Sequence, residues 1–172
     1  MIALEALRLE HIVKRFPGVV ALKNVDFSLE YGEVHAICGE NGAGKSTLMK
    51  VVCGVYKPDE GKMFLEGNEV NFTNPNEAYE KGVAIIFQET SLFEEMTVLE
   101  NMFLGHELQK QVGCFKVIDY AEMRKKAADI FKKLNTKIDL NEKIKNLGMA
   151  QKQMVEIAKA LTYEAKVLIL DE

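Results

Sequence analysis

Residues 39–47 read G-E-N-G-A-G-K-S-T, and this stretch limits the possible folds of the chain more than any other. The spacing G-x-x-x-x-G-K-[S/T] of a loop that wraps a polyphosphate is met by Gly39, Gly44, Lys45 and Ser46. Glycines let backbone N–H groups approach the phosphates closely, lysine adds a positive charge, and the serine hydroxyl can bind Mg²⁺. A helix that begins at this point directs its partial positive charge at the anion.

The residues on either side of this loop support the same interpretation. Residues 33–38 (E-V-H-A-I-C) are mostly apolar and predict a short strand, and residues 46–53 predict a helix. Strand, glycine-rich loop and helix in this order distinguish a phosphate-binding loop from a chance glycine-rich turn.

The composition is that of one globular domain. The chain has 172 residues, enough to bury a core, with 48% hydrophobic and 28% charged residues. The net charge of −4 argues against a general nucleic-acid binder, which normally carries a basic excess. No apolar run in the sequence is long enough to cross a bilayer, so work at a membrane would require a peripheral subunit.

Alternating patterns surround the loop and predict strands. Residues 7–14 and 19–30 alternate apolar and polar side chains on either side of a turn at Arg15–Gly18, which indicates a β-rich opening layer. Residues 62–72 predict a further hairpin. The continuous apolar run Val83–Phe87 predicts a strand that is buried on both faces.

Helical patterns dominate the second half of the chain. Thr97 is expected to cap a short helix over residues 98–103, and Asp119 a longer helix with apolar residues every three or four positions. The basic residues of the longer helix are distributed around its solvent face, which favours a solvated surface over a nucleic-acid patch. Residues 149–162 predict a third helix, with Met154, Ile157, Ala158 and Leu161 on the buried face and Lys152, Glu156 and Lys159 on the other. Residues 104–118 give no clear signal.

The sequence ends on an apolar strand and two acids. Residues 166–170 (K-V-L-I-L) are followed by Asp171 and Glu172. The carboxyl end of a strand in an open α/β sheet is a typical place for catalytic groups. Because a domain does not normally finish one residue after such a strand, we expect the natural sequence to continue.

The order of these features resembles the ATP-binding subunits of ABC transporters, especially the sugar-importer type that serves ribose, galactose and xylose. The stretches that carry the resemblance are K-R-F-P-G-V-V-A-L, G-E-N-G-A-G-K-S-T-L-M-K, T-V-L-E-N-M-F-L-G and Q-M-V-E-I-A-K-A-L. The last stretch, just before the strand that Asp171 follows, is specific to ABC proteins, whereas the phosphate loop indicates only a nucleoside triphosphatase.

The resemblance implies an α/β fold, a P-loop NTPase of the ABC ATPase type that is truncated after the Walker B strand. Such a fold would have a β-rich N-terminal layer, a mostly parallel core sheet and an inserted helical subdomain. All 172 residues would form part of one ATP-binding domain. Residues 1–88 would form the β layer and RecA-like core, residues 89–162 the mainly helical subdomain with the signature helix, and residues 163–172 the Walker B strand.

The resemblance also implies residue roles, with ATP and Mg²⁺ as cofactors. Phe16 would stack on the adenine, although it could instead be a turn aromatic that packs on the core. The backbone from Asn41 to Thr47 and the Lys45 ammonium would hold the phosphates. The full set of cofactor-binding residues in this loop would be Gly39, Glu40, Asn41, Gly42, Ala43, Gly44, Lys45, Ser46 and Thr47. Mg²⁺ would be held by Ser46, Gln88 and Asp171, and the catalytic residues would be Lys45, Gln88 and Glu172, which polarises the attacking water. Gln88 could instead simply cap a strand.

The family's signature, L-S-G-G-Q, is altered here to L-G-M-A-Q. In the family this segment completes the nucleotide site of a partner domain, and here its residues would be Gly148, Met149, Ala150 and Gln151. Gly148 removes a hydroxyl, and the next two residues add bulk where close backbone approach is needed. We therefore expect an asymmetric pair of sites, with poor hydrolysis at the one this segment faces.

The implied function is ATP hydrolysis that powers import of a sugar or similar small solute, with the chain peripheral on the cytoplasmic face of the membrane. The implied partners are a second ABC ATP-binding domain, membrane-spanning permease subunits that the loop Glu89–Glu95 would sense, and indirectly a periplasmic or extracellular sugar-binding protein; nucleic acid is not among them. Two alternatives remain. One is a soluble ABC ATPase outside transport, and the other is a nucleotide-binding module with little hydrolysis of its own.

Overall fold

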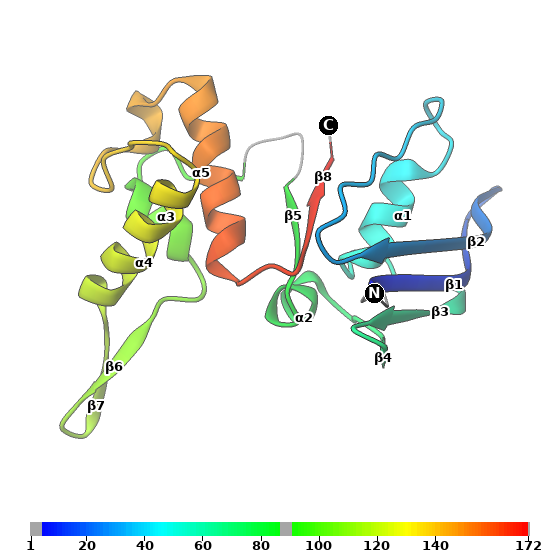
Figure 1. Ribbon diagram of the computed structural model, residues 1–172, viewed down its shortest axis with the longest axis horizontal. Coiled ribbons are helices and arrows are strands. Elements are labelled where there is room, and N and C mark those ends of the chain that lie inside the picture. Colours follow the sequence, from blue (N-terminus) through cyan, green and yellow to red (C-terminus); the bar gives the residue numbers. More distant parts are fainter. Residues whose placement is uncertain (1–4, 87–90, 172) are drawn as a thin grey trace. The chain divides into compact units, whose positions relative to one another are not determined.

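The computed structural model describes residues 5–86 and 91–171 (Figure 1). These residues divide into two compact units. The first unit contains the chain up to Ile85 together with Ala165–Asp171, and the second contains Ile86–Glu164. No helix in the described ranges is both long and apolar enough to span a membrane.

The first unit opens with a four-stranded antiparallel sheet in the order β2-β1-β3-β4 (Figure 1). The long hairpin of β1 (Glu5–Phe16) and β2 (Val19–Glu30) confirms the predicted β-rich opening layer. β3 (Glu60–Leu65) and β4 (Asn68–Val70) form the second predicted hairpin. Most buried residues of this sheet lie on β1, where Leu7, Leu9 and Ile12 are almost fully buried.

The rest of the first unit supplies helix α1 (Lys45–Val52), helix α2 (Pro75–Glu80) and two further strands. β5 (Val83–Ile86) and β8 (Val167–Leu170) form a two-stranded sheet. The Gly82 carbonyl accepts hydrogen bonds from the N–H groups at the start of β8, so both strands begin at the same end and run parallel. Side chains of α1, β5 and β8 share one hydrophobic core with the antiparallel sheet.

One expectation about strands was wrong. Residues 33–38 form no strand, and Val34 is 98% exposed. In β8, Val167 and Ile169 are buried while Leu168 and Leu170 are exposed. A strand needs hydrogen-bonded neighbours on its edges, and no described strand pairs with residues 33–38 or with β8 other than β5.

The second unit is mainly helical and confirms the three predicted helices. α3 (Val98–Phe103) begins with a capping box, in which Thr97 and Glu100 each accept a backbone N–H of the other. α4 (Tyr120–Lys133) is capped by Asp119, and its basic side chains are exposed or half-buried, as expected for a solvated face. α5 (Met149–Thr162) follows a short 3₁₀ helix, η1 (Ile144–Asn146), and packs with α3 and α4 around a second core.

The buried face of α5 differs from the prediction. Val155 and Ala158 are fully buried, whereas Met154, Ile157 and Leu161 are only partly buried. The helix is therefore rotated by about one residue, roughly 100°, from the expected orientation. Glu156, which we expected on the solvent face, is only 7% exposed.

A hairpin occupies the stretch that gave no clear sequence signal. β6 (Gln109–Val112) and β7 (Phe115–Ile118) pair in antiparallel register, and all eight residues are exposed. Figure 1 shows the hairpin extending away from α3, α4 and α5. With no buried face, the hairpin has no regular hydrophobic alternation by which the sequence could predict it.

Candidate nucleotide site

The phosphate loop owes its shape to two glycines with positive φ. Gly42 has φ 86° and Gly44 has φ 92°, a region that side chains disfavour. A Cβ on Gly44 would also lie 2.6 Å from the carbonyl oxygen of Ala21. Gly44 therefore has to be glycine for both reasons, and it forms the N-cap of α1.

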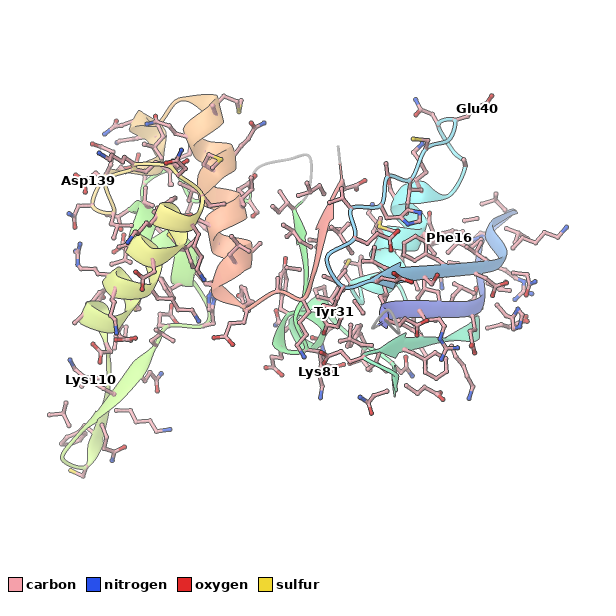
Figure 2. The ribbon with its side chains drawn as sticks, viewed as in Figure 1. Phe16, Tyr31, Glu40, Lys81, Lys110 and Asp139 are labelled. Atoms are coloured by element: carbon pink, nitrogen blue, oxygen red, sulfur yellow. The ribbon has the colours of Figure 1, made fainter. Side chains whose placement is uncertain are left out.

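The Lys45 side chain lies inside the curve of the loop. Its Nζ donates hydrogen bonds to the carbonyl oxygens of Gly39 at 2.7 Å and Glu40 at 3.0 Å. Residues 39–43 are exposed, and Figure 2 places Glu40 at the tip of the loop. The positive charge is thus held among loop residues that solvent can reach.

The N-terminus of α1 is suited to an anion. No side chain caps this end, and its first turn contains no acidic residue. The N–H groups of the first turn and the helix dipole consequently present partial positive charge next to the Lys45 ammonium. Backbone, dipole and lysine together form an anion-binding surface.

Ser46 and Asp171 meet beside this loop. They are 125 residues apart in sequence, and the Ser46 Oγ donates a 3.2 Å hydrogen bond to the Asp171 Oδ1. Asp171 directly follows β8, so the strand delivers its carboxylate to the start of α1. One hydroxyl and one carboxylate are hard oxygen ligands, which fit Mg²⁺, since this ion is usually held by one or two carboxylates together with substrate phosphates.

Phe16 lies at the end of β1 and is labelled in Figure 2. Its ring packs edge-on against Tyr56, with the ring centroids 5.2 Å apart at an interplanar angle of 73°. Lys14 Nζ is 5.6 Å from the Phe16 centroid. This packing supports the structural interpretation of Phe16, and its stacking on adenine stays a prediction. The sequence did not predict a role for Tyr56. The one signal that pointed to it is the presence of an aromatic residue shortly after α1.

The segment that replaces L-S-G-G-Q begins α5 in the second unit. Gly148 is the N-cap, and its N–H donates to the Gln151 Oε1 at 3.1 Å. Met149 is 68% exposed, and Ala150 and Gln151 are also exposed. A Cβ on Gly148 would meet only the Gln151 Oε1, at 3.8 Å, so a serine fits at this position.

The structure thus gathers part of the predicted site. Residues 39–47 and Asp171 come together in the first unit, and Gly148–Gln151 belong to the second. Gln88 and Glu172 lie outside the described residues. Among the described residues, no cluster of three or more histidine, cysteine, aspartate or glutamate side chains could hold a metal by itself.

These features define a class of protein. A glycine-rich loop ends in the N-terminus of a helix, lysine lies in the loop, and serine meets an aspartate that follows the strand β8. That combination is a P-loop nucleotide-binding site. The family model described as "ABC transporter" matches residues 22–172, so the chain belongs to the ABC transporter family.

Curated relatives are similar over most of the chain. A ribose import ATP-binding protein, RbsA 1 of Burkholderia thailandensis, is 50% identical over 166 residues, covering 96% of this chain and 32% of that protein. A xylose import ATP-binding protein, XylG of Geobacillus kaustophilus, is 51% identical over 168 residues, covering 96% and 32%. The chain therefore spans about a third of the length of these relatives.

Solved structures confirm the predicted fold class. A nucleotide-free ATP-binding cassette of an ABC transporter superposes with a TM-score of 0.83 at 34% identity, covering 98% of this chain and 69% of that one. A dimeric bacterial ABC transporter cassette has a TM-score of 0.75 at 26% identity, covering 96% and 73%.

Proposed function

We propose that this chain binds ATP with Mg²⁺ and hydrolyses it to power the import of a sugar or a similar small solute. The observation that carries the proposal is the Ser46–Asp171 hydrogen bond beside the lysine-bearing loop. Relatives about 50% identical are named as import ATP-binding proteins for ribose and xylose, which supports the solute class.

In the proposed site, each described residue has one task. The loop N–H groups and Lys45 bind the phosphates, and Lys45 exchanges its bonds to the Gly39 and Glu40 carbonyls for phosphate oxygens. Ser46 and Asp171 hold Mg²⁺, which when bound neutralises the charge that develops during phosphoryl transfer. Gln88 and Glu172 orient the attacking water.

The proposed setting is peripheral, at the cytoplasmic face of the membrane. A second ABC ATP-binding domain, in the same or a fused chain, pairs with this one, and permease subunits receive the resulting movement. A sugar-binding protein outside the membrane delivers the solute. The name of the dimeric cassette neighbour supports pairing of ATP-binding domains.

A second candidate is a nucleotide-binding module with little hydrolysis of its own. Gly148 favours it, because this N-cap offers no hydroxyl to a phosphate of a paired domain. A missing donor to a developing anion costs about 3 kcal/mol in comparable sites. A serine fits at position 148. If the missing hydroxyl limits hydrolysis, Gly148→Ser should raise the rate of phosphate release by a paired assembly.

Titration of a fluorescent ATP analogue, with and without Mg²⁺, tests the proposal. Lys45→Ala should weaken binding about ten- to hundredfold, because a charge-assisted hydrogen bond is lost. Lys50→Ala, on the same helix, is the matched control and should bind like the parent. Ser46→Ala and Asp171→Asn should each reduce the Mg²⁺-dependent part of the affinity. Equal affinity of the parent and Lys45→Ala would refute the assignment of this loop.

A further inference from the structure

A buried carboxylate in the middle of α5 has no task in the nucleotide chemistry. Glu156 is 7% exposed, and it is the acidic member of the three buried polar residues described, with Asn101 and Thr162. Burial of a carboxylate is unfavourable unless hydrogen bonds or charges compensate it. The buried Glu156 carboxylate therefore requires a partner that compensates the free-energy cost of its burial.

The partner is a backbone group at the start of a loop. The N–H of Ser91 donates a 2.8 Å hydrogen bond to the Glu156 Oε1. Lys159, three residues further along α5, is half-buried; burial lowers its pKa, and the nearby Glu156 carboxylate acts in the opposite direction. The contact is thus a hydrogen bond to an acid in a partly dry environment, which is stronger than one between neutral groups.

A second buried side chain holds the same loop from α3. Asn101 is fully buried; it accepts the N–H of Phe93 at 2.7 Å and donates to the carbonyl oxygen of Phe93 at 3.0 Å. The Phe93 side chain nevertheless remains 55% exposed. The loop Ser91–Met96 therefore has a fixed backbone and an exposed aromatic residue.

α5 contacts this loop at a second point. Lys152, one turn before Glu156, forms an ion pair with Glu94 at 2.8 Å. The Glu94 side chain is 67% exposed, and exposed ion pairs contribute little. Of the two contacts from α5, the part-buried one to Ser91 is consequently the stronger restraint.

We propose that Glu156 is a positioning residue, which fixes the loop Ser91–Met96 to α5 so that the loop and the helix move as one piece. Ser91 is three residues after Gln88 in the sequence, and α5 begins at the altered signature segment. On the proposed function, a nucleotide-dependent movement of the loop Ser91–Met96 reaches α5 through this hydrogen bond. The restraint of the loop by Glu156 in the absence of nucleotide does not depend on that function.

The test measures the loop directly in the 172-residue chain. The sequence contains no tryptophan, so Phe93→Trp introduces a single fluorescent reporter. In this background, Glu156→Ala should speed amide exchange of Ser91 about ten- to hundredfold by NMR, because it deletes a hydrogen bond to a charged group. The tryptophan anisotropy should fall with it.

Two further variants separate positioning from stability. Glu156→Gln keeps an acceptor oxygen without the charge, so it should speed Ser91 exchange by only a few-fold. Thr162→Ala removes another buried polar side chain of α5, whose hydroxyl contacts the Lys159 and Met102 carbonyls and the His106 ring, and it should leave Ser91 exchange unchanged at similar loss of stability.

The outcomes decide between the two roles. Parent-like Ser91 exchange in Glu156→Ala, or equal acceleration in Thr162→Ala, would overturn the proposal. If Glu156→Ala does not fold, parent-like exchange in Glu156→Gln overturns it instead. Addition of ATP and Mg²⁺ is a separate arm: absence of binding contradicts the proposed function but leaves the nucleotide-free exchange result intact.

Discussion

Replacing Asn101 by leucine should destabilise the helical unit substantially. Leucine has a similar volume, so packing is largely kept while all three hydrogen bonds of the side chain are lost. These bonds join the Phe93 N–H at 2.7 Å, the Phe93 carbonyl at 3.0 Å and the Thr97 carbonyl at 3.0 Å. At about 1 kcal/mol for each bond, the expected loss in the free energy of unfolding is about 3 kcal/mol.

Guanidinium denaturation followed by circular dichroism at the helix band measures this loss. Asn146→Leu is the matched control, because the Asn146 side chain is exposed and its described hydrogen bond is to the Glu142 side chain; it should cost less than about 0.5 kcal/mol. Asn101→Asp keeps an oxygen for the Phe93 N–H but turns the other toward two carbonyl oxygens, so it should destabilise as well. A loss below about 0.5 kcal/mol for Asn101→Leu would refute the argument that these hydrogen bonds hold the loop.

Three further perturbations have definite expected outcomes. Gly44→Ala should lower the free energy of unfolding by about 2 kcal/mol or more, because residue 44 has φ 92° and the added Cβ would lie 2.6 Å from the Ala21 carbonyl oxygen. Gly42→Ala should cost only about 1 kcal/mol, because no described atom lies within 4 Å of the added Cβ. Thermal unfolding compares the two variants. Thr97→Ala should cost about 1 kcal/mol by removing the capping box, and Thr97→Ser should restore most of it. Hydrogen bonds from the Thr97 N–H and hydroxyl lower the pKa of Glu100. The stability that the Glu100 carboxylate adds is therefore present above its ordinary pKa of 4.5 and is lost as pH falls through the lower pKa of the folded state. Denaturation at several pH values should show a flatter dependence of stability on pH for Glu100→Gln.

Sequence patterns predict the structure well where the signal is local. The capping box at Thr97 needs only a hydroxyl and a carboxylate three residues apart, so α3 begins where the sequence indicates. Asp119 likewise starts α4, and glycine at position 44 reports a backbone conformation that side chains disfavour. Each of these depends on neighbours within one turn of the chain.

The predictions fail where distant residues decide. Residues 33–38 have an apolar strand-like composition, but a strand forms only with a paired neighbour. On α5, two adjacent stripes are similarly apolar, and packing against α3 and α4 determines which is buried. That choice places Glu156 inside, where no helical periodicity would put an acid.

The candidate site falls between these cases. The phosphate-loop spacing predicts Lys45 and Ser46, and the acid after an apolar strand predicts Asp171. Their meeting at 3.2 Å is a tertiary result that depends on β8 ending beside the start of α1. The contact between Phe16 and Tyr56 is likewise tertiary, and no sequence pattern connects the two rings.

The exposed hairpin of β6 and β7 has a consequence for how this chain can change in evolution and in the laboratory. Because none of its strand residues contributes to the helical core, residues can be added or removed at its turn without altering that core. Cys114, an exposed thiol at this turn, offers an attachment point for a fluorophore once the exposed Cys38 is replaced by serine; Cys53 is buried. The same turn would accept an inserted peptide or a fused domain.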